Sequence, residues 1–256
     1  MSGPLLGRVA IVTGAGRNIG AAVATRLAAD GAAVVVNYPN AAGRGEAAAV
    51  AARIVAAGGR ALAVRADVAD ETEVRAMVAE TIEALGHPDI LVNNAAVSVS
   101  AQAHWSELSG AAWDHVLRVN VTGAFLCAKA LYPSMHARGG GDIVTMSSVT
   151  ALLGRVGNLH YVTSKAALIG FTRALAREAG PEHIRVNALI LGAIRTPDEA
   201  VYGSQEEVDA TVLPLQSLKR RGIPSDVGGV VSFLISGDAG FITGQCIVVD
   251  GGWVMQ

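Results

Sequence analysis

The stretch "VTGAGRNIGAAVATRLAADGAAVVVNYPN" (Val12–Asn40) decides the fold. An apolar run leads into a glycine-rich turn, a helical pattern follows, and a second apolar run closes the unit. Gly14 and Gly16 let the backbone turn tightly and approach a pyrophosphate, while Gly20 lets the helix pack close to the strand. The helix that begins near Asn18 directs its free N–H groups at that phosphate. The stretch therefore predicts a strand–turn–helix–strand unit that binds a nucleotide.

The glycine spacing departs from the common dinucleotide fingerprint. In G-x-G-x-x-G the last glycine comes three residues after the second, whereas Gly20 comes four residues after Gly16. A glycine-rich turn alone is weak evidence, because incidental glycines also occur in ordinary strand–helix turns. Its position after the first apolar run favours the nucleotide-binding interpretation.

The rest of the chain repeats this alternation. The apolar runs are continuous and rich in β-branched residues, which is typical of strands covered on both faces of a parallel sheet. They are "RVAIVTG", "AAVVVNY", "ALAVRAD", "DILVNNA", "GDIVTMSS", "RVNALILG" and "QCIVVDGG". Helical patterns occupy residues 18–29, 45–57, 71–85, 111–138, 161–179 and 226–236. We expect one doubly wound Rossmann-type α/β domain over residues 1–256, with a seven-stranded, mostly parallel sheet and helices on both faces.

Two local features refine this expectation. Asp70 precedes the third helical pattern and is placed to cap it, and Glu73 is placed to complete a capping box. Residues 192–224 are the one long irregular stretch. They follow the sixth strand at the carboxyl edge of the sheet, so we expect them to form a substrate lid.

Composition excludes several classes of protein. The chain of 256 residues is 51% hydrophobic and 16% charged, which argues against disorder, and its net charge of −2 gives no reason to expect nucleic acid. Cys127 and Cys246 are isolated, and the six histidines show no H-x-x-x-H spacing, so neither a disulfide framework nor a metal site is expected. We expect a cytoplasmic protein, because the sequence shows no signal peptide and no apolar run long enough to span a membrane.

The stretch "SVTALLGRVGNLHYVTSK" (148–165) carries the candidate catalytic residues. Tyr161 and Lys165 are four residues apart and share one face of a helix. A free tyrosine has a pKa of about 10, and an ammonium group within about 4–6 Å can lower it by about 1–3; Lys165 is placed to do this. Ser148 ends a strand, where its hydroxyl can stabilise an oxyanion. A lone Y-x-x-x-K is common by chance, but Ser148 and the glycine turn support a catalytic role.

Together these motifs resemble the short-chain dehydrogenase/reductase family nearly from end to end. "TGAGRNIG" is similar to the family's cofactor turn T-G-x-x-x-[G/A]-x-G, with Asn18 where glycine or alanine is usual. Asparagine tolerates a positive φ, so we expect the turn to survive. "RADV", "NNAA", "LILGAIRT" and "GQCIVVDGGW" resemble further family segments, with Ala96 in place of glycine and Leu191 in place of proline.

The resemblance implies roles for individual residues. Asp67 accepts from the adenine amino group with Val68 beside it, Thr196 holds the nicotinamide carboxamide, and Asn120 orders a water near Lys165. The expected cofactor-binding set is Gly14, Gly16, Arg17, Asn18, Ile19, Gly20, Tyr38, Asp67, Val68, Asn94, Ala95, Tyr161, Lys165, Ile194 and Thr196. The implied reaction is hydride transfer between nicotinamide and a carbonyl carbon, with Tyr161 as proton donor and without a metal.

The end of the second strand favours NADP(H) over NAD(H). An NAD enzyme of this fold places an acid there for the ribose 2′-hydroxyl, whereas Asn37, Tyr38, Pro39 and Asn40 carry none. We expect Arg17 to pair with a 2′-phosphate, with Arg44 as a second contact.

Substrate and assembly are less sharply specified. "ALAREAG" and "SDVGGVVSFLISGDAGFITGQ" resemble 3-oxoacyl-acyl-carrier-protein reductases. Arg177 would suit an acidic carrier protein, but Leu126 stands where a basic residue is expected, so the sequence favours a small ketone or acyl thioester without a carrier protein. The helical patterns 111–138 and 161–179 carry too few charges for a one-sided surface, so one face can pack on the sheet and the other needs a partner. The family resemblance implies that this partner is a second copy of the chain, in a homotetramer.

Three alternatives stay open at this stage. One is an alcohol, polyol or sugar dehydrogenase that works oxidatively. Another is a nucleotide-binding regulator without turnover, against which the intact Ser148, Tyr161, Lys165 and Asn120 argue. The third, a different doubly wound nucleotide binder such as a methyltransferase, leaves "YVTSK" and "VNNAA" without a role.

Overall fold

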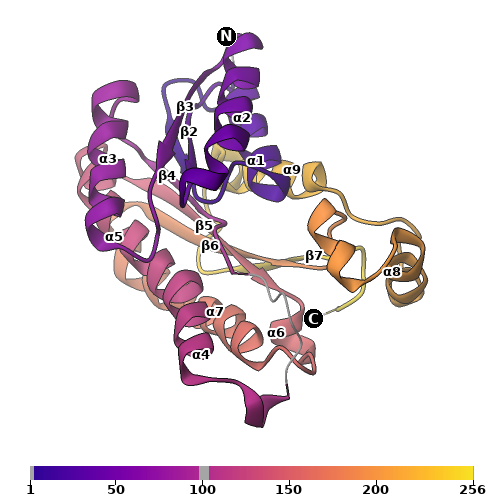
Figure 1. Ribbon diagram of the computed structural model, residues 1–256. Coiled ribbons are helices and arrows are strands. Elements are labelled where there is room, and N and C mark those ends of the chain that lie inside the picture. Colours follow the sequence, from indigo (N-terminus) through magenta and orange to yellow (C-terminus); the bar gives the residue numbers. More distant parts are fainter. Residues whose placement is uncertain (1–2, 98–103, 256) are drawn as a thin grey trace.

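A seven-stranded parallel sheet forms the centre of the molecule (Figure 1). The computed structural model describes residues 3–97 and 104–255. The strand order β3-β2-β1-β4-β5-β6-β7 confirms the predicted doubly wound fold, and all the pairings are parallel. The strands are β1 (Val9–Val12), β2 (Ala33–Tyr38), β3 (Arg60–Arg65), β4 (Ile90–Asn93), β5 (Gly141–Ser148), β6 (Ile184–Leu191) and β7 (Cys246–Val249).

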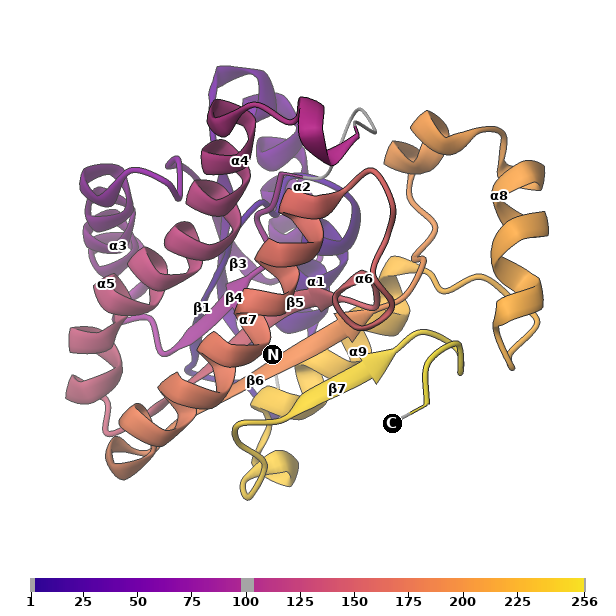
Figure 2. The same cartoon turned by 90° about the horizontal axis from the view of Figure 1, so that it is seen from below.

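Helices cover both faces of this sheet (Figures 1 and 2). The helices are α1 (Asn18–Ala29), α2 (Arg44–Ala56), α3 (Glu71–Leu85), α4 (Gly110–Leu117), α5 (Gly123–Ala137), α6 (Thr150–Leu153), α7 (Leu159–Ala179), α8 (Gln205–Val212) and α9 (Pro224–Ile235). One buried cluster joins α1, α2 and α9 to the sheet, and a second joins α3, α5 and α7 to its other side. Burial on both faces explains why the strand sequences are apolar without alternation.

The topology brings distant motifs to one edge. β1 and β4 are neighbours in the sheet, although 77 residues lie between Val12 and Ile90 in the sequence. After β3 the chain returns to the other side of β1, so the direction of strand addition reverses there. The glycine turn after β1, "NNAA" after β4 and Ser148 at the end of β5 therefore meet at the carboxyl edge of the sheet. Open α/β sheets bind their ligands at such a reversal point.

One predicted helix contains an irregularity that the sequence pattern does not reveal. Residues 110–137 are helical throughout, as expected for 111–138, but a π-helical turn, Arg118–Thr122, lies between α4 and α5. Such turns often occur at functional sites, and this one contains the buried Asn120. The predicted cap of α3 is half right. Asp70 accepts from the Thr72 and Glu73 amides, but the Glu73 carboxylate accepts from the Asp67 amide instead of closing a capping box.

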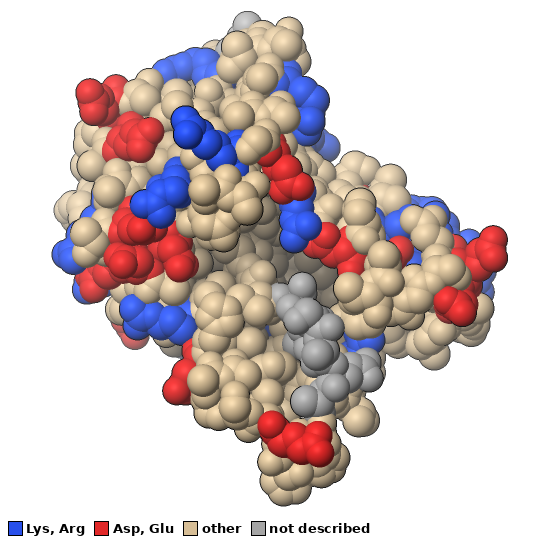
Figure 3. All heavy atoms as spheres, viewed as in Figure 1, with Lys and Arg blue, Asp and Glu red and all other residues tan. Residues whose placement is uncertain are grey.

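The segment 192–224 forms a lobe beside the sheet, and the molecule is hollowed where this lobe meets the main body (Figure 3). It contains a 3-10 helix, Pro197–Tyr202, followed by α8. Arg221, whose side chain is 2% exposed, pairs with Glu199 at 2.5 Å and with Asp209 at 2.8 Å. Asp209 also pairs with Arg195. These ion pairs join the beginning, middle and end of the segment to one another.

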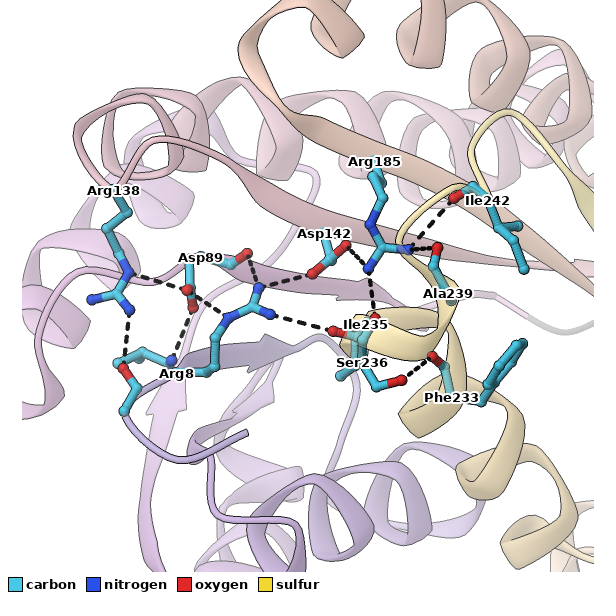
Figure 4. Close-up of polar contacts among 12 residues, drawn as sticks. Arg8, Asp89, Arg138, Asp142, Arg185, Phe233, Ile235, Ser236, Ala239 and Ile242 are labelled. Atoms are coloured by element: carbon cyan, nitrogen blue, oxygen red, sulfur yellow. Dashed lines mark hydrogen bonds and ion pairs between the residues drawn. The ribbon is translucent and has the colours of Figure 1, made fainter. Parts of the chain in front are cut away.

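A second ion network lies at the opposite, amino edge of the sheet (Figure 4). Asp89 accepts from Arg8 Nε at 2.6 Å and from Arg138 Nε at 3.0 Å. Asp142 pairs with Arg8 at 2.8 Å and with Arg185 at 2.6 Å. Burial raises the pKa of Asp142 against the opposing effect of both arginines. The network ties together the starts of β1, β4, β5 and β6, far from the carboxyl edge.

None of the helices in the described residues is long and apolar enough to cross a bilayer.

Candidate active site

The glycine turn after β1 has the backbone shape that the sequence predicts. Gly14 has φ +60°, and a Cβ there would lie 3.0 Å from the Cα of Ala95. Asn18 has φ +51°, which confirms that asparagine adopts the left-handed conformation at this departure from the family pattern. At Gly20 a Cβ would lie only 2.4 Å from the Gly14 carbonyl oxygen. The close approach of α1 to the turn therefore requires Gly20.

Three polar side chains form hydrogen bonds around the glycine turn. Asn94 donates through Nδ2 to the carbonyls of Thr13 and Gly14 at 2.9 and 3.0 Å. The Thr13 hydroxyl accepts from the amides of Asn94 and Ala95, each at 3.0 Å. The buried Asn37 accepts from the Gly14 amide at 3.1 Å and donates to Ala66 O at 2.9 Å. Sequence reasoning missed Thr13 and Asn37 as turn-holding residues, although both lie at strand ends beside the motif.

The side chain of Arg17 forms an ion pair with the 192–224 segment. Its Nη1 pairs with Asp198 at 2.8 Å, and Asn18 Nδ2 donates to the other oxygen of the same carboxylate at 2.9 Å. Arg17 and Asn18 thus join the glycine turn to the 3-10 helix of the 192–224 segment. Tyr38 is 9% exposed and, with Arg44, lines a surface hollow of about 620 Å³ between α2 and β3.

The residues expected around adenine and nicotinamide lie along the same edge. Asp67 accepts from the Ala69 amide at 2.9 Å through one oxygen, and Val68 is buried, close to Gly123. Ile19 packs partly buried against the core. Ile194 forms an isolated parallel bridge with Gly222, and the half-buried Thr196 caps the 3-10 helix Pro197–Tyr202 by its backbone.

Ser148 and Tyr161 come together from β5 and α7. The Ser148 hydroxyl accepts from Thr150 Oγ1 at 3.0 Å, and its hydrogen bond to Tyr161 lowers the tyrosine pKa. Burial acts in the opposite direction and is stronger, so the pKa of Tyr161 rises to about 12. The phenol is therefore protonated at neutral pH and is suited to donate a proton.

Lys165 lies one helical turn after Tyr161, on the same face of α7, as predicted. Its Nζ lies 5.6 Å from the centre of the Tyr161 ring and donates to Met146 O at 2.8 Å. Burial lowers the pKa of Lys165 to about 8. The expected lowering of the tyrosine pKa by Lys165 is not seen: burial raises the pKa of Tyr161, and the opposing effects come from Ser148 and Arg155 instead of Lys165. Ser147 Oγ donates to Lys165 O at 2.8 Å and so positions the helix beside the strand.

Asn120 contacts both α7 and the segment after β4. Its Nδ2 donates to Ser164 Oγ at 2.9 Å, and its Oδ1 accepts from the Val97 amide at 2.8 Å. The π-helical turn directs this side chain inward, where it is 2% exposed. Ser164, fully buried and next to Lys165, is a partner that the sequence pattern did not identify. Within residues 3–97 and 104–255, no three His, Cys, Asp or Glu side chains are grouped to hold a metal ion.

Comparison with known proteins agrees with this geometry. A family model described as enoyl-(acyl carrier protein) reductase matches residues 14–254. Human dehydrogenase/reductase SDR family member 4 is 38% identical over 249 residues, which are 97% of this chain and 88% of the human protein. A 7α-hydroxysteroid dehydrogenase solved with NADH and 7-oxo glycochenodeoxycholic acid has a TM-score of 0.90 and 34% identity, covering 98% of this chain and 96% of that one. A metagenomic blue fluorescent protein solved with NADPH has a TM-score of 0.89 and 37% identity, covering 98% and 100%.

Proposed function

We propose that this protein is an NADP(H)-dependent reductase that converts a ketone to a secondary alcohol. The premise is that the chain belongs to the short-chain dehydrogenase/reductase family. Membership of the family makes it an oxidoreductase that acts on CH–OH or C=O groups with a nicotinamide cofactor. The convergence of Ser148, Tyr161 and Lys165 at the carboxyl edge, with Asn120 behind them, carries the proposal.

The glycine turn fits the phosphates of such a cofactor. A Cβ at Gly14 or Gly20 would meet backbone atoms, so the turn lies as close to α1 and "NNAA" as glycine allows. The N-cap residue of α1 is Arg17, a donor, which cannot accept from the first N–H groups of the helix. These groups are therefore suited to an external anion.

A few side chains carry out the separate steps of the proposed reaction. A bound nicotinamide supplies the hydride. Ser148 orients the substrate oxygen and stabilises its developing charge, and Tyr161 gives it a proton. Lys165 lies near the phenol. Its pKa of about 8 is close to neutral pH, so its amine can both hold and release a proton there. Asn120 fixes α7 through Ser164 and keeps this relay in place.

The preference for NADP(H) rests on the end of β2. Tyr38 occupies this end without an acid, and Arg44 lies beside it in the same hollow. Arg17 pairs with Asp198, so we assign the 2′-phosphate first to Arg44 and treat Arg17 as a contact that must leave Asp198. We expect kcat/KM to be at least about tenfold higher with NADPH than with NADH, which is about 1.4 kcal/mol. Tyr38→Asp should erode that preference by repelling the phosphate, and an unmodified enzyme that prefers NADH would refute it.

The substrate class is best identified by a direct screen. We propose a small ketone or 3-oxoacyl-type compound, with residues 192–224 as a lid, and do not favour a carrier-protein partner. The oxidation of NADPH should be followed by its absorbance with short β-keto esters, acyl thioesters, cyclic ketones and diketones as substrates. Turnover of secondary alcohols or sugars alone would favour the oxidative alternative instead, which the related hydroxysteroid dehydrogenase keeps open.

We also propose a homotetramer. The outer face of α7 exposes Ala166, Ala167, Gly170 and Ala174, and Phe125 of α5 is 49% exposed. A charge on this face, such as Ala167→Glu, should weaken assembly, because an unpaired charge in an interface is costly. Light scattering that shows a monomer at micromolar concentration would contradict the proposal. The cytoplasmic location and the metal-free chemistry stay predictions.

A further inference from the structure

Arg155 occupies a distinctive place beside the catalytic residues. It lies between α6 and α7, in the loop that joins Ser148 to Tyr161, and six residues before Tyr161. Its guanidinium carbon lies 4.6 Å from the centre of the Tyr202 ring, at the end of the 3-10 helix of the 192–224 segment. The contact therefore joins the catalytic loop to the proposed lid.

The charge of Arg155 is available, unlike that of the neighbouring arginines. Arg17 pairs with Asp198, and Arg195 and Arg221 pair with Asp209 and Glu199. Within the described part of the chain, Arg155 has no carboxylate at ion-pair distance, and residues 98–103 ("SVSAQA") contain no acidic residue in the sequence. Its side chain contacts an aromatic face instead.

Arg155 and Tyr202 are also close enough to Tyr161 to influence it. The guanidinium lowers and the Tyr202 phenol raises the pKa of the Tyr161 hydroxyl. An anion bound by Arg155 would thus lie near the carbonyl that receives the proton, within the span of one small molecule.

The geometry suits a carboxylate. A guanidinium that stacks by its face on a tyrosine ring keeps the N–H groups along its edge free, and two of these N–H groups match a carboxylate in a bidentate arrangement. The phosphates of a thioester carrier lie at the far end of a long arm, away from the reacting carbonyl. Because Arg155 lies against Tyr202 and both act on the Tyr161 hydroxyl, the site favours an acid group on the ketone itself.

We propose that the substrate is an oxo acid whose carboxylate is bound by Arg155, with the Tyr202 ring holding the guanidinium in place. This rests on the proposed reductase function and names its substrate class. Arg155 is then a specificity residue that leaves the hydride and proton steps to the groups already described.

The test compares short 3-, 4- and 5-oxo acids with their methyl esters, with NADPH saturating. Wild type should reduce its best acid with a kcat/KM at least about tenfold above that of the matching ester, which is about 1.4 kcal/mol. Arg155→Met should lose at least that factor on the acid, mostly in KM, and change the ester little. Arg155→Lys should recover part of the loss, because it restores charge without the planar fork. Arg53→Met, on the exposed side of α2, is the matched control and should change neither.

A binding measurement separates recognition from loop structure. A saturated carboxylate of matching length should inhibit wild type competitively and Arg155→Met at least about tenfold more weakly, whereas its amide should inhibit neither. Equal losses on acid and ester in Arg155→Met, or an ester reduced as well as the acid by wild type, would overturn the inference while leaving the reductase function intact. A folded, NADPH-binding protein that reduces no carbonyl compound would overturn both.

Discussion

Gly20→Ala tests the contact between α1 and the cofactor turn with the smallest possible change. The added Cβ would lie 2.4 Å from Gly14 O, 2.6 Å from Asn94 Nδ2 and 2.9 Å from Ala15 Cα. Two of these atoms belong to the backbone and cannot rotate away. The start of α1 must therefore move outward by about 1 Å to restore ordinary van der Waals separation.

The size of the effect follows from these contacts. Overpacking of this kind costs about 1–3 kcal/mol. The Asn94 amide also loses one of its bonds to the turn, at about 1 kcal/mol. Alanine in a helix returns at most about 1 kcal/mol relative to glycine. We expect the free energy of unfolding to fall by about 2 kcal/mol, and NADPH affinity to fall at least about tenfold because the helix N–H groups move from the phosphate.

Urea unfolding at fixed protein concentration measures the first effect as a lower midpoint with an unchanged slope. Fluorescence titration with NADPH measures the second. Gly229→Ala in α9 is the matched control. Its Cβ would meet only the end of the Arg26 side chain, at 3.8 Å, so the same substitution should stabilise by about 0.5–1 kcal/mol. A Gly20→Ala protein with the wild-type midpoint and affinity would refute the close packing of α1 on the turn.

Three further predictions concern the ion pairs and the buried Lys165. Asp89→Ala should lower the free energy of unfolding by about 3 kcal/mol in urea, because Arg8 and Arg138 lose a buried partner; a loss below about 1 kcal/mol would contradict this. Burial lowers the pKa of Lys165 from 10.5 to about 8, so the folded protein binds fewer protons than the unfolded chain between these values and its stability rises with pH across them. The free energy of unfolding of Lys165→Met, relative to that of wild type, should therefore be highest below pH 8 and should fall by ~3 kcal/mol as the pH approaches 10.5. A difference between the two proteins that stays constant with pH would argue against a buried ammonium. Arg221→Met should speed limited proteolysis within residues 197–221, since Glu199 and Asp209 lose their shared partner; unchanged cleavage would show that these pairs do not hold the segment.

The sheet and the positions of Tyr161 and Lys165 on one helical face could be predicted from the sequence, because each depends on local pattern. Continuous apolar runs gave seven parallel strands, and the i, i+4 spacing placed Tyr161 and Lys165 on one helical face. The positive φ of Asn18 could also be expected, because asparagine tolerates this backbone conformation better than most residues.

Long-range pairings could not be predicted in this way. Arg17 meets Asp198, 181 positions away, and Glu73 serves the Asp67 amide instead of its own helix cap. The π-helical turn contains Asn120, whose side chain donates to Ser164 of α7, and no periodicity in residues 111–138 reveals this contact. The tyrosine pKa depends on burial that only the assembled site provides.

Turnover by Tyr161→Phe tests the central claim most directly. The substitution removes the proton donor and keeps the ring, so single-turnover reduction of the best ketone with bound NADPH should slow by about 10²–10⁴-fold. The dissociation constant for NADPH should stay within about threefold, a change of less than 1 kcal/mol, because the phenol contributes little to nucleotide binding. A variant that keeps more than about a tenth of the wild-type rate, with proton transfer rate-limiting, would contradict the assignment of Tyr161 and with it the proposed mechanism.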